Sequence, residues 1–195
     1  MAVNARLSSW VIRDVLIVSA LGIALVAVDG WHHEATAWWS AALTGLVGFI
    51  AAYVSCYILH EWGHWAGAVS SGSRVKILPP NQPLLAGFDT TAHTARQFVW
   101  LSWGGVLGYL IVAASCLTAY ALAPHRLGTA ALAVGGLAFV VQSLAVDVPQ
   151  ILRVRRGADP TEANRTGASP AVILRRTWQT WSVLTVAIVG WNLLI

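Results

Sequence analysis

Charged residues are scarce in this chain of 195 residues. Asp, Glu, Lys and Arg make up 10% of it, whereas a soluble domain usually carries about 25%. Hydrophobic residues make up 57%, and the mean hydropathy is +0.65. These values exclude an ordinary soluble domain. They indicate an integral membrane protein whose residues 1–195 form a single domain embedded in the lipid bilayer.

Cysteine is also rare, since only Cys56 and Cys116 occur. Both fall within apolar runs, which favours small buried side chains over a disulfide. The sequence has no internal repeat and no low-complexity tract. A net charge of +4 and a pI of about 9.6 suggest nucleic acid in a soluble protein. Here membrane topology explains the basic residues, and no nucleic-acid partner is expected.

Five apolar segments are present, and a helix needs about 20 residues to cross a ~30 Å hydrocarbon core. The sequence therefore predicts an all-α membrane protein, a polytopic bundle of about five transmembrane helices. Their expected bounds are 11–28, 38–69, 98–122, 129–152 and 177–195. The first segment is short, and an alternative is a cleaved signal peptide with Arg6 and Arg13 as its basic region. No clear A-x-A cleavage site follows it.

The basic residues predict the orientation of these helices. With the N-terminus in the cytoplasm, all of the twelve except Arg126 fall in inner segments, as the positive-inside rule requires. Residues 153–176 then form a cytoplasmic loop. Tryptophans fit an aromatic belt at the inner ends (Trp10, Trp100, Trp103, Trp178, Trp181) and the outer ends (Trp31, Trp38, Trp39, Trp191). We expect a multi-pass protein of a bacterial or archaeal cell membrane, and the sequence indicates no oligomeric state.

The second apolar segment ends in the motif His60-Glu61-Trp62-Gly63-His64. Residues four apart lie on one face of a helix, so the two imidazoles can bind one metal ion, with Glu61 beside them as a general base. Ionisable groups at membrane depth are costly, which favours a functional interpretation. In the predicted topology the motif lies near the cytoplasmic side.

A catalytic zinc site needs three protein ligands and an open position. Asp147 is the best candidate for the third ligand, because it interrupts an apolar run and its expected depth matches that of His60 and His64. Pro149 would loosen the helix locally and help aim the carboxylate. The alternative is an interfacial Asp that ends a helix.

Two other side chains can be considered as ligands. Cys56 precedes His60 by one turn, about 5.4 Å of rise, which is too far for a zinc–sulfur bond of about 2.3 Å. His93 lies in the loop before the third predicted helix. A solvated loop histidine is the favoured interpretation there, and an approach to substrate or metal is the alternative.

The segment from Val75 to Phe88 has two apolar stretches around a proline-rich turn, which predicts a hairpin or re-entrant loop after the second helix. One hypothesis is that an edge of this hairpin pairs with an unwound substrate segment. A hairpin that only covers the site is the alternative. Small residues on the third predicted helix, Gly104, Gly105 and Gly108, favour close helix packing.

The segment Leu59-His60-Glu61-Trp62-Gly63-His64-Trp65-Ala66-Gly67-Ala68, followed by Ser71-Gly72-Ser73-Arg74-Val75, resembles the site-2 protease class of intramembrane zinc metalloproteases. The resemblance covers about residues 38–152. It implies a three-helix core with zinc held by His60, His64 and Asp147, and with Glu61 as general base. In that family a Gly follows the ligand Asp and an Asn-Pro run precedes it, whereas Asp147 is followed by Val148 and Pro149. No PDZ-like insert is present, so substrate filtering by such a domain is not implied.

Together these features predict a zinc metalloendopeptidase with one Zn²⁺ per chain, acting on transmembrane protein substrates within the lipid bilayer. An alternative is a catalytically inactive scaffold, or pseudoprotease, that retains the metal motif. A membrane di-iron oxidase is a third possibility, but it needs many more ligands. The chain has six histidines, and three of them fall in predicted outer loops.

Overall fold

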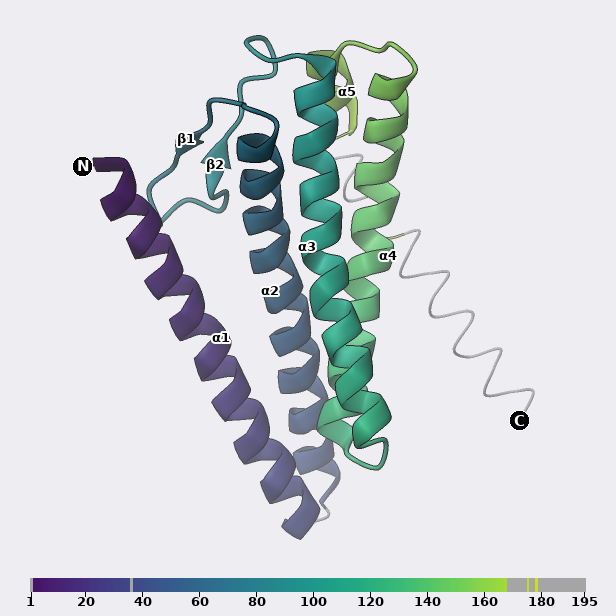
Figure 1. Cartoon of the computed structure of the whole chain (residues 1–195). Helices are drawn as coiled ribbons and strands as arrows, with labels where there is room; N and C mark the ends of the chain where they lie inside the picture. Colours follow the sequence, from purple (N-terminus) through teal and green to yellow (C-terminus); the bar gives the residue numbers. More distant parts are fainter. Residues whose placement is uncertain (1, 36, 168–174, 176–177, 179–195) are drawn as a thin grey trace.

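The computed structural model describes residues 2–35, 37–167, 175 and 178. Within them it contains four long helices: α1 (Ala2–Ala35), α2 (Trp38–Ser70), α3 (Ala95–Leu122) and α4 (Leu127–Arg155) (Figure 1). All four are long and apolar enough to cross a membrane. The prediction of an all-α membrane bundle is thus confirmed, with four such helices in the described residues rather than five. The expected fifth helix, 177–195, lies outside the described residues apart from Trp178.

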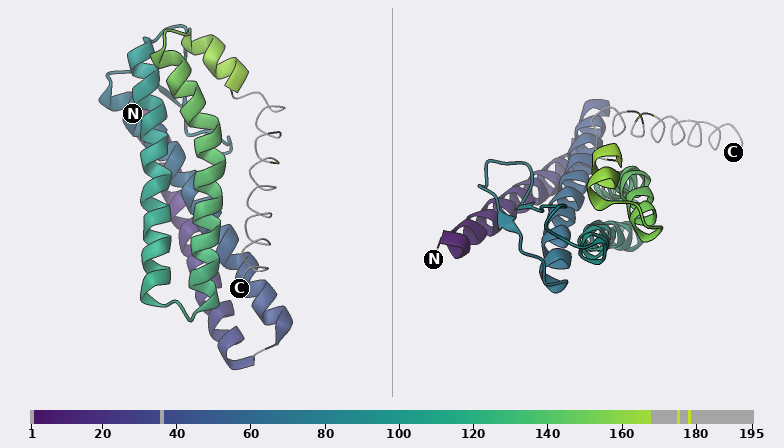
Figure 2. Two further views of the ribbon diagram at one scale, coloured as in Figure 1. Left: turned by 90° about the vertical axis from the view of Figure 1, so that its right-hand side faces the viewer. Right: turned by 90° about the horizontal axis from the view of Figure 1, so that it is seen from above.

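Helix α2 is the centre of the bundle, because it contacts α1, α3 and α4. Helices α2, α3 and α4 form a three-helix core, and α1 diverges from it toward the N-terminus (Figures 1 and 2). At 1.5 Å per residue a helix of 33 residues is about 50 Å long, which exceeds the ~30 Å hydrocarbon core. One end of α2 can therefore project beyond the lipid tails and support the segments that cover it.

The end of α1 extends seven residues past the predicted bound, from 28 to Ala35. Polar side chains in this extension find partners in neighbouring elements. The Asp29 carboxylate accepts a hydrogen bond from the Gly128 N–H at 2.9 Å and lies 3.4 Å from the Arg126 guanidinium. These contacts give the Asp29 carboxylate partners inside the protein, although Asp29 lies just beyond the helix end that hydropathy predicts.

The tight contact between α2 and α3 depends on glycines, as predicted for the small-residue face of the third helix. A Cβ on Gly63 would overlap the backbone carbonyl of Gly104, and one on Gly108 would overlap that of Leu59. Small residues allow helix backbones to approach this closely in lipid. The same close contact fixes the position of the His-Glu-x-x-His motif against α3.

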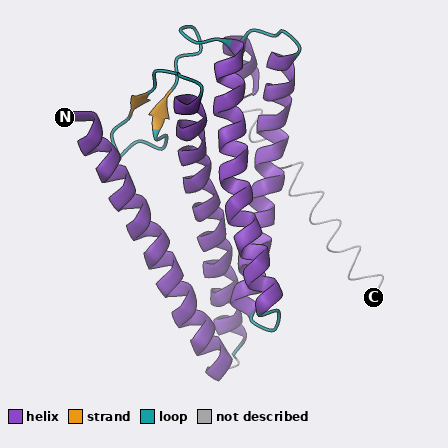
Figure 3. Ribbon diagram, viewed as in Figure 1, coloured by secondary structure: helices purple, strands orange, loops and turns teal. Residues whose placement is uncertain are grey.

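A small hairpin lies between the N-terminal part of α1 and the end of α2 (Figure 3). Strands β1 (Lys76–Ile77) and β2 (Ala86–Gly87) pair antiparallel, with Ile77 opposite Ala86. It occupies the segment where the proline-rich turn predicted a hairpin. Ile77 and Leu85 of this segment pack on Trp10 of α1, and all three side chains are buried.

A short helix, α5 (Pro160–Gly167), lies within residues 153–176, which were predicted to be only a loop. The reason is local capping. The Asp159 carboxylate accepts hydrogen bonds from the N–H groups of Thr161 and Glu162, at 2.8 and 3.1 Å, and proline is favoured at the first helical position. Ala163 of this helix is buried against Phe98 and Val154, so α5 covers the hairpin end of the core.

Candidate metal centre

The two motif histidines face each other near the hairpin end of α2. His60 Nε2 and His64 Nε2 are 3.0 Å apart, and the ring centroids are 4.2 Å apart. Two nitrogens bound to one tetrahedral zinc at 2.0–2.1 Å would be about 3.3 Å apart. At 3.0 Å the two nitrogens are within hydrogen-bond distance of each other, and a small outward shift would bring them to the spacing of two ligands of one metal ion.

The orientation of His64 is fixed from α3. Its Nδ1 lies 2.9 Å from the Leu101 carbonyl oxygen. A carbonyl can only accept, so Nδ1 carries the hydrogen and the lone pair of Nε2 points toward His60. Metal-binding histidines commonly show this arrangement, in which the second ring nitrogen donates to a backbone carbonyl.

Space for the His64 ring comes from Gly105 of α3. A Cβ at position 105 would lie 2.7 and 2.8 Å from the two ring nitrogens, which is closer than real contacts allow. The absence of a side chain at this position therefore makes room for a candidate metal ligand. The sequence assigned Gly105 to helix packing alone.

Glu61 is buried beside the histidines. Its Oε2 accepts a hydrogen bond from the Leu85 N–H at 3.2 Å, which joins the motif to the hairpin. His60, Glu61 and His64 each offer one possible ligand atom, and these three atoms lie within 4.8 Å of one another. Among the described residues, a group of His, Cys, Asp or Glu side chains compact enough to hold a metal ion is found here.

Asp147 projects from α4 toward the same site. Its Oδ2 lies 4.0 Å from His60 Nδ1, and the residue lines the same cavity as the motif. It is not part of the compact group of three, so metal binding by Asp147 stays a prediction. Pro149 lies inside α4, and the helix continues through it to Arg155.

Three buried side-chain atoms in the described residues have no hydrogen-bond partner: His60 Nδ1, Asp147 Oδ2 and the Tyr109 hydroxyl. All three belong to one neighbourhood, since the rings of Tyr109 and His60 are 5.6 Å apart. Buried polar atoms are nearly always paired in folded proteins. Their gathering here indicates a place built for a further group, and imidazole with carboxylate is a donor set that suits zinc.

A cavity of about 360 Å³ adjoins these residues. It is far larger than the roughly 30 Å³ of one water molecule, so it has room for a group larger than a single water. Its wall combines the motif, the hairpin, α3, α4 and α5. Besides His60, Glu61, His64 and Asp147, residues that line it include Leu84, Ala86, Phe88, Leu101, Gln150 and Asn164.

The other two sequence candidates have different partners. Cys56 is buried, and its Sγ lies 3.9 Å from the Tyr109 carbonyl. His93 Nδ1 donates to the Asp89 carbonyl at 2.6 Å, and its Nε2 accepts from the Arg74 N–H at 3.1 Å. Both ring nitrogens of His93 are thus bonded to the backbone of this loop rather than left to solvent.

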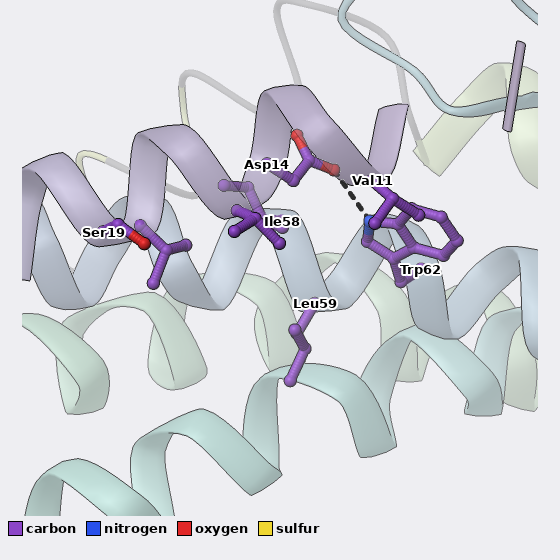
Figure 4. A pocket seen from close by; sticks show the side chains of 8 residues that line it. Val11, Asp14, Ser19, Ile58, Leu59 and Trp62 are labelled. Carbon is purple, nitrogen blue, oxygen red and sulfur yellow. Dashed lines mark hydrogen bonds between the residues drawn. The ribbon is translucent and has the colours of Figure 1, made fainter. Parts of the chain in front are cut away.

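Sequence reasoning missed Trp10 and Asp14. It assigned Trp10 to the aromatic belt, but this side chain is wholly buried and its indole N–H donates to the Leu78 carbonyl at 2.7 Å. It assigned no role to Asp14, whose carboxylate accepts a hydrogen bond from the Trp62 indole N–H at 2.7 Å (Figure 4). No local pattern could reveal these roles, because both depend on how α1 lies against other elements.

No family model, no curated protein and no solved structure matches this chain. The fold and the site define a multi-pass α-helical membrane protein with a metal-capable His-Glu-x-x-His group inside its helix bundle. A closer assignment depends on the chemistry of that group.

Proposed function

We propose that this protein is an intramembrane zinc metalloendopeptidase that hydrolyses peptide bonds in or near the transmembrane segments of membrane proteins. The observation that carries the proposal is the compact group of His60, Glu61 and His64 beside a cavity in the bundle. An apolar helix rarely contains three ionisable side chains without a function. The distribution of basic residues supports a cytoplasmic N-terminus and a site near the cytoplasmic face.

Each residue has a distinct role in this proposal. His60 and His64 would hold one zinc through ring nitrogens, with Asp147, whose Oδ2 lies 4.0 Å from His60 Nδ1, as the third ligand. When bound, zinc lowers the pKa of water and polarises a carbonyl. Glu61 accepts the proton of the attacking water and later passes it to the leaving amine. Its buried carboxylate, held on one oxygen by the Leu85 N–H, keeps the other oxygen for this transfer.

A transmembrane substrate must be unwound before its peptide bonds are accessible, because a helix shields them. The hairpin supports a way of presenting the unwound segment, since Leu84, Ala86 and Phe88 line the cavity. An extended segment that pairs with the hairpin would run past the motif. In the alternative, the hairpin only covers the site and excludes water from it.

Metal analysis and a cleavage assay test the proposal together. We expect the purified chain to hold about one zinc and to cut a transmembrane peptide, and a chelator should abolish cleavage. His60→Ala should lose both zinc and activity. His125→Ala is the matched control, because this exposed histidine lies between α3 and α4, at the end of the bundle remote from the hairpin. Cleavage that persists without metal would refute the proposal, and zinc binding without cleavage would favour the inactive scaffold.

The role of Asp147 has its own test. If Asp147 is a ligand, Asp147→Ala should weaken zinc binding by more than the roughly 10- to 100-fold expected for loss of a residue that only orients a ligand. Competition with a chromophoric chelator measures this affinity. Val141→Ala, on an exposed part of the same helix, should leave it unchanged. Unchanged affinity in Asp147→Ala would refute the ligand role.

A further inference from the structure

The hairpin lacks one hydrogen bond next to the motif. Ile77 faces Ala86, so the next facing pair is Leu78 and Leu85. In an antiparallel hairpin, successive facing pairs alternate between pairs joined by two backbone hydrogen bonds and pairs joined by none. Leu78 N–H donates to the Leu85 carbonyl at 3.0 Å, which makes this a bonded pair. The second bond of the pair would run from the Leu85 N–H to the Leu78 carbonyl, but each of these two groups has another partner. The Leu78 carbonyl accepts from the Trp10 indole at 2.7 Å, and the Leu85 N–H donates to Glu61 at 3.2 Å.

Helix α1 holds this side of the hairpin through three backbone carbonyls within residues 77–80. Besides the bond from Trp10, Arg6 Nη1 donates to the Ile77 carbonyl at 3.3 Å and Arg13 Nη1 donates to the Pro80 carbonyl at 2.9 Å. The Arg13 guanidinium also lies 3.7 Å from the centre of the Trp10 ring. The indole is thus held in place by a cation–π contact above and by the buried hairpin residues around it.

The same part of α1 is fixed to α2 at the level of the motif. The Asp14 carboxylate accepts from the Trp62 indole and pairs with Arg13 at 2.6 Å, and Trp62 directly follows Glu61 in the chain (Figure 4). An apolar cavity of about 400 Å³ adjoins this bond between α1 and α2. The bond from the Trp62 indole to Asp14 ties α1 to α2 at this level, close to where Trp10 meets the hairpin.

From these contacts we propose that Trp10 is a positioning residue for the Glu61 carboxylate. Its indole occupies the Leu78 carbonyl, and so it leaves the Leu85 N–H for Glu61. This inference rests on the proposed function in treating Glu61 as a base, although the contacts themselves do not. A bond from a backbone N–H to a carboxylate is charge-assisted, and it fixes one oxygen so that the other keeps a defined direction.

Removal of the indole N–H should change which groups are paired. A partly buried carbonyl left without a donor is costly, and the antiparallel pattern places the Leu85 N–H opposite the Leu78 carbonyl across the hairpin. We therefore expect the hairpin to close its missing bond when Trp10 cannot donate. Glu61 then loses its partner and can turn away from the cavity.

The Leu85 amide reports directly on this exchange. In the full chain labelled with ¹⁵N, Glu61→Gln should shift the Leu85 amide resonance, because a charged acceptor is replaced by a neutral one. In the Trp10→Phe background the same substitution should no longer shift it. Trp31→Phe, the same change at the far end of α1 in a partly exposed ring, should preserve the response. A Leu85 amide that still responds to Glu61→Gln in the Trp10→Phe protein overturns the proposal.

Cleavage kinetics separate positioning from a merely structural role. Trp10→Phe should lower kcat by about ten-fold, the effect of losing one hydrogen bond, while KM and zinc content stay at wild-type values. A purely structural role would lower zinc content as well. If Trp10→Phe does not fold, replacement of Trp10 by 3-benzothienylalanine keeps the shape and removes only the N–H donor. If the wild type cleaves nothing, the proposed function fails, and the amide resonance still decides the role of Trp10.

Discussion

Glu61→Gln is expected to reduce peptide cleavage by about 10²- to 10⁴-fold, the usual contribution of a general base, and to leave zinc bound. The glutamine side chain has nearly the same shape and still offers an oxygen to the Leu85 N–H, so the hairpin contact can persist. What it cannot do is accept the proton of water. Single-turnover cleavage of a transmembrane peptide, with zinc content measured on the same sample, checks both halves of the result.

The control for this substitution is Glu34→Gln, which makes the same change at an exposed position near the C-terminal end of α1. It should leave cleavage and zinc content unchanged. Cleavage that survives Glu61→Gln would remove the proposed mechanism. Loss of zinc together with activity would have a different meaning. It would make Glu61 a ligand rather than a base, which its place in the compact group also allows.

Hydropathy predicted the four membrane-length helices of the described residues because each contains an apolar stretch long enough to cross the hydrocarbon core. It did not predict where α1 ends. Asp29 lies inside the helix, and its carboxylate is satisfied by the Gly128 N–H, almost one hundred residues further along the chain. A polar residue at the end of an apolar segment thus resembles a loop until its tertiary partner is known.

Helix α5 differs from that case, because its signal is local. Asp159 followed by Pro160 is typical of a helix start, whereas the overall polarity of residues 153–176 indicates only a loop. Composition measures whether a segment is buried in lipid. Capping residues indicate where a helix begins, and the two signals have to be considered separately.

The candidate site was predictable where it depends on helix periodicity and not where it depends on packing. The i, i+4 spacing places His60 and His64 on one face, and the structure brings their Nε2 atoms to 3.0 Å. The roles of Trp10 and Asp14 follow from the place of α1 beside the hairpin, which no spacing in the sequence encodes. Asp147 falls between the two cases, since it lines the same cavity but remains outside the compact group.

Gly105→Ala is expected to weaken zinc binding by on the order of 100-fold, at the upper end of the effects seen when a ligand loses its supporting contacts. The added Cβ would meet three atoms of the His64 imidazole and no backbone atom within the same distance. The cheapest relief is rotation of the ring. Rotation breaks the bond from Nδ1 to the Leu101 carbonyl and turns Nε2 away from His60. Zinc titration with a competing chelator measures the loss.

Two further glycines separate this effect from general damage to the fold. Gly45→Ala, in α2 with nothing near the new methyl group, should leave zinc affinity unchanged, and Gly108→Ala should lower stability because its Cβ meets the Leu59 backbone. Gly105→Ala should differ from both, with zinc affinity reduced and the thermal stability of the zinc-free protein close to wild type. An overlap with backbone, as at position 108, cannot be relieved by rotating a side chain. The overlap at position 105 can be relieved by rotating the His64 imidazole, so the substitution there disturbs the metal centre. Wild-type zinc affinity in Gly105→Ala would mean that α3 shifts away from α2 instead, and that His64 does not depend on this glycine for its position.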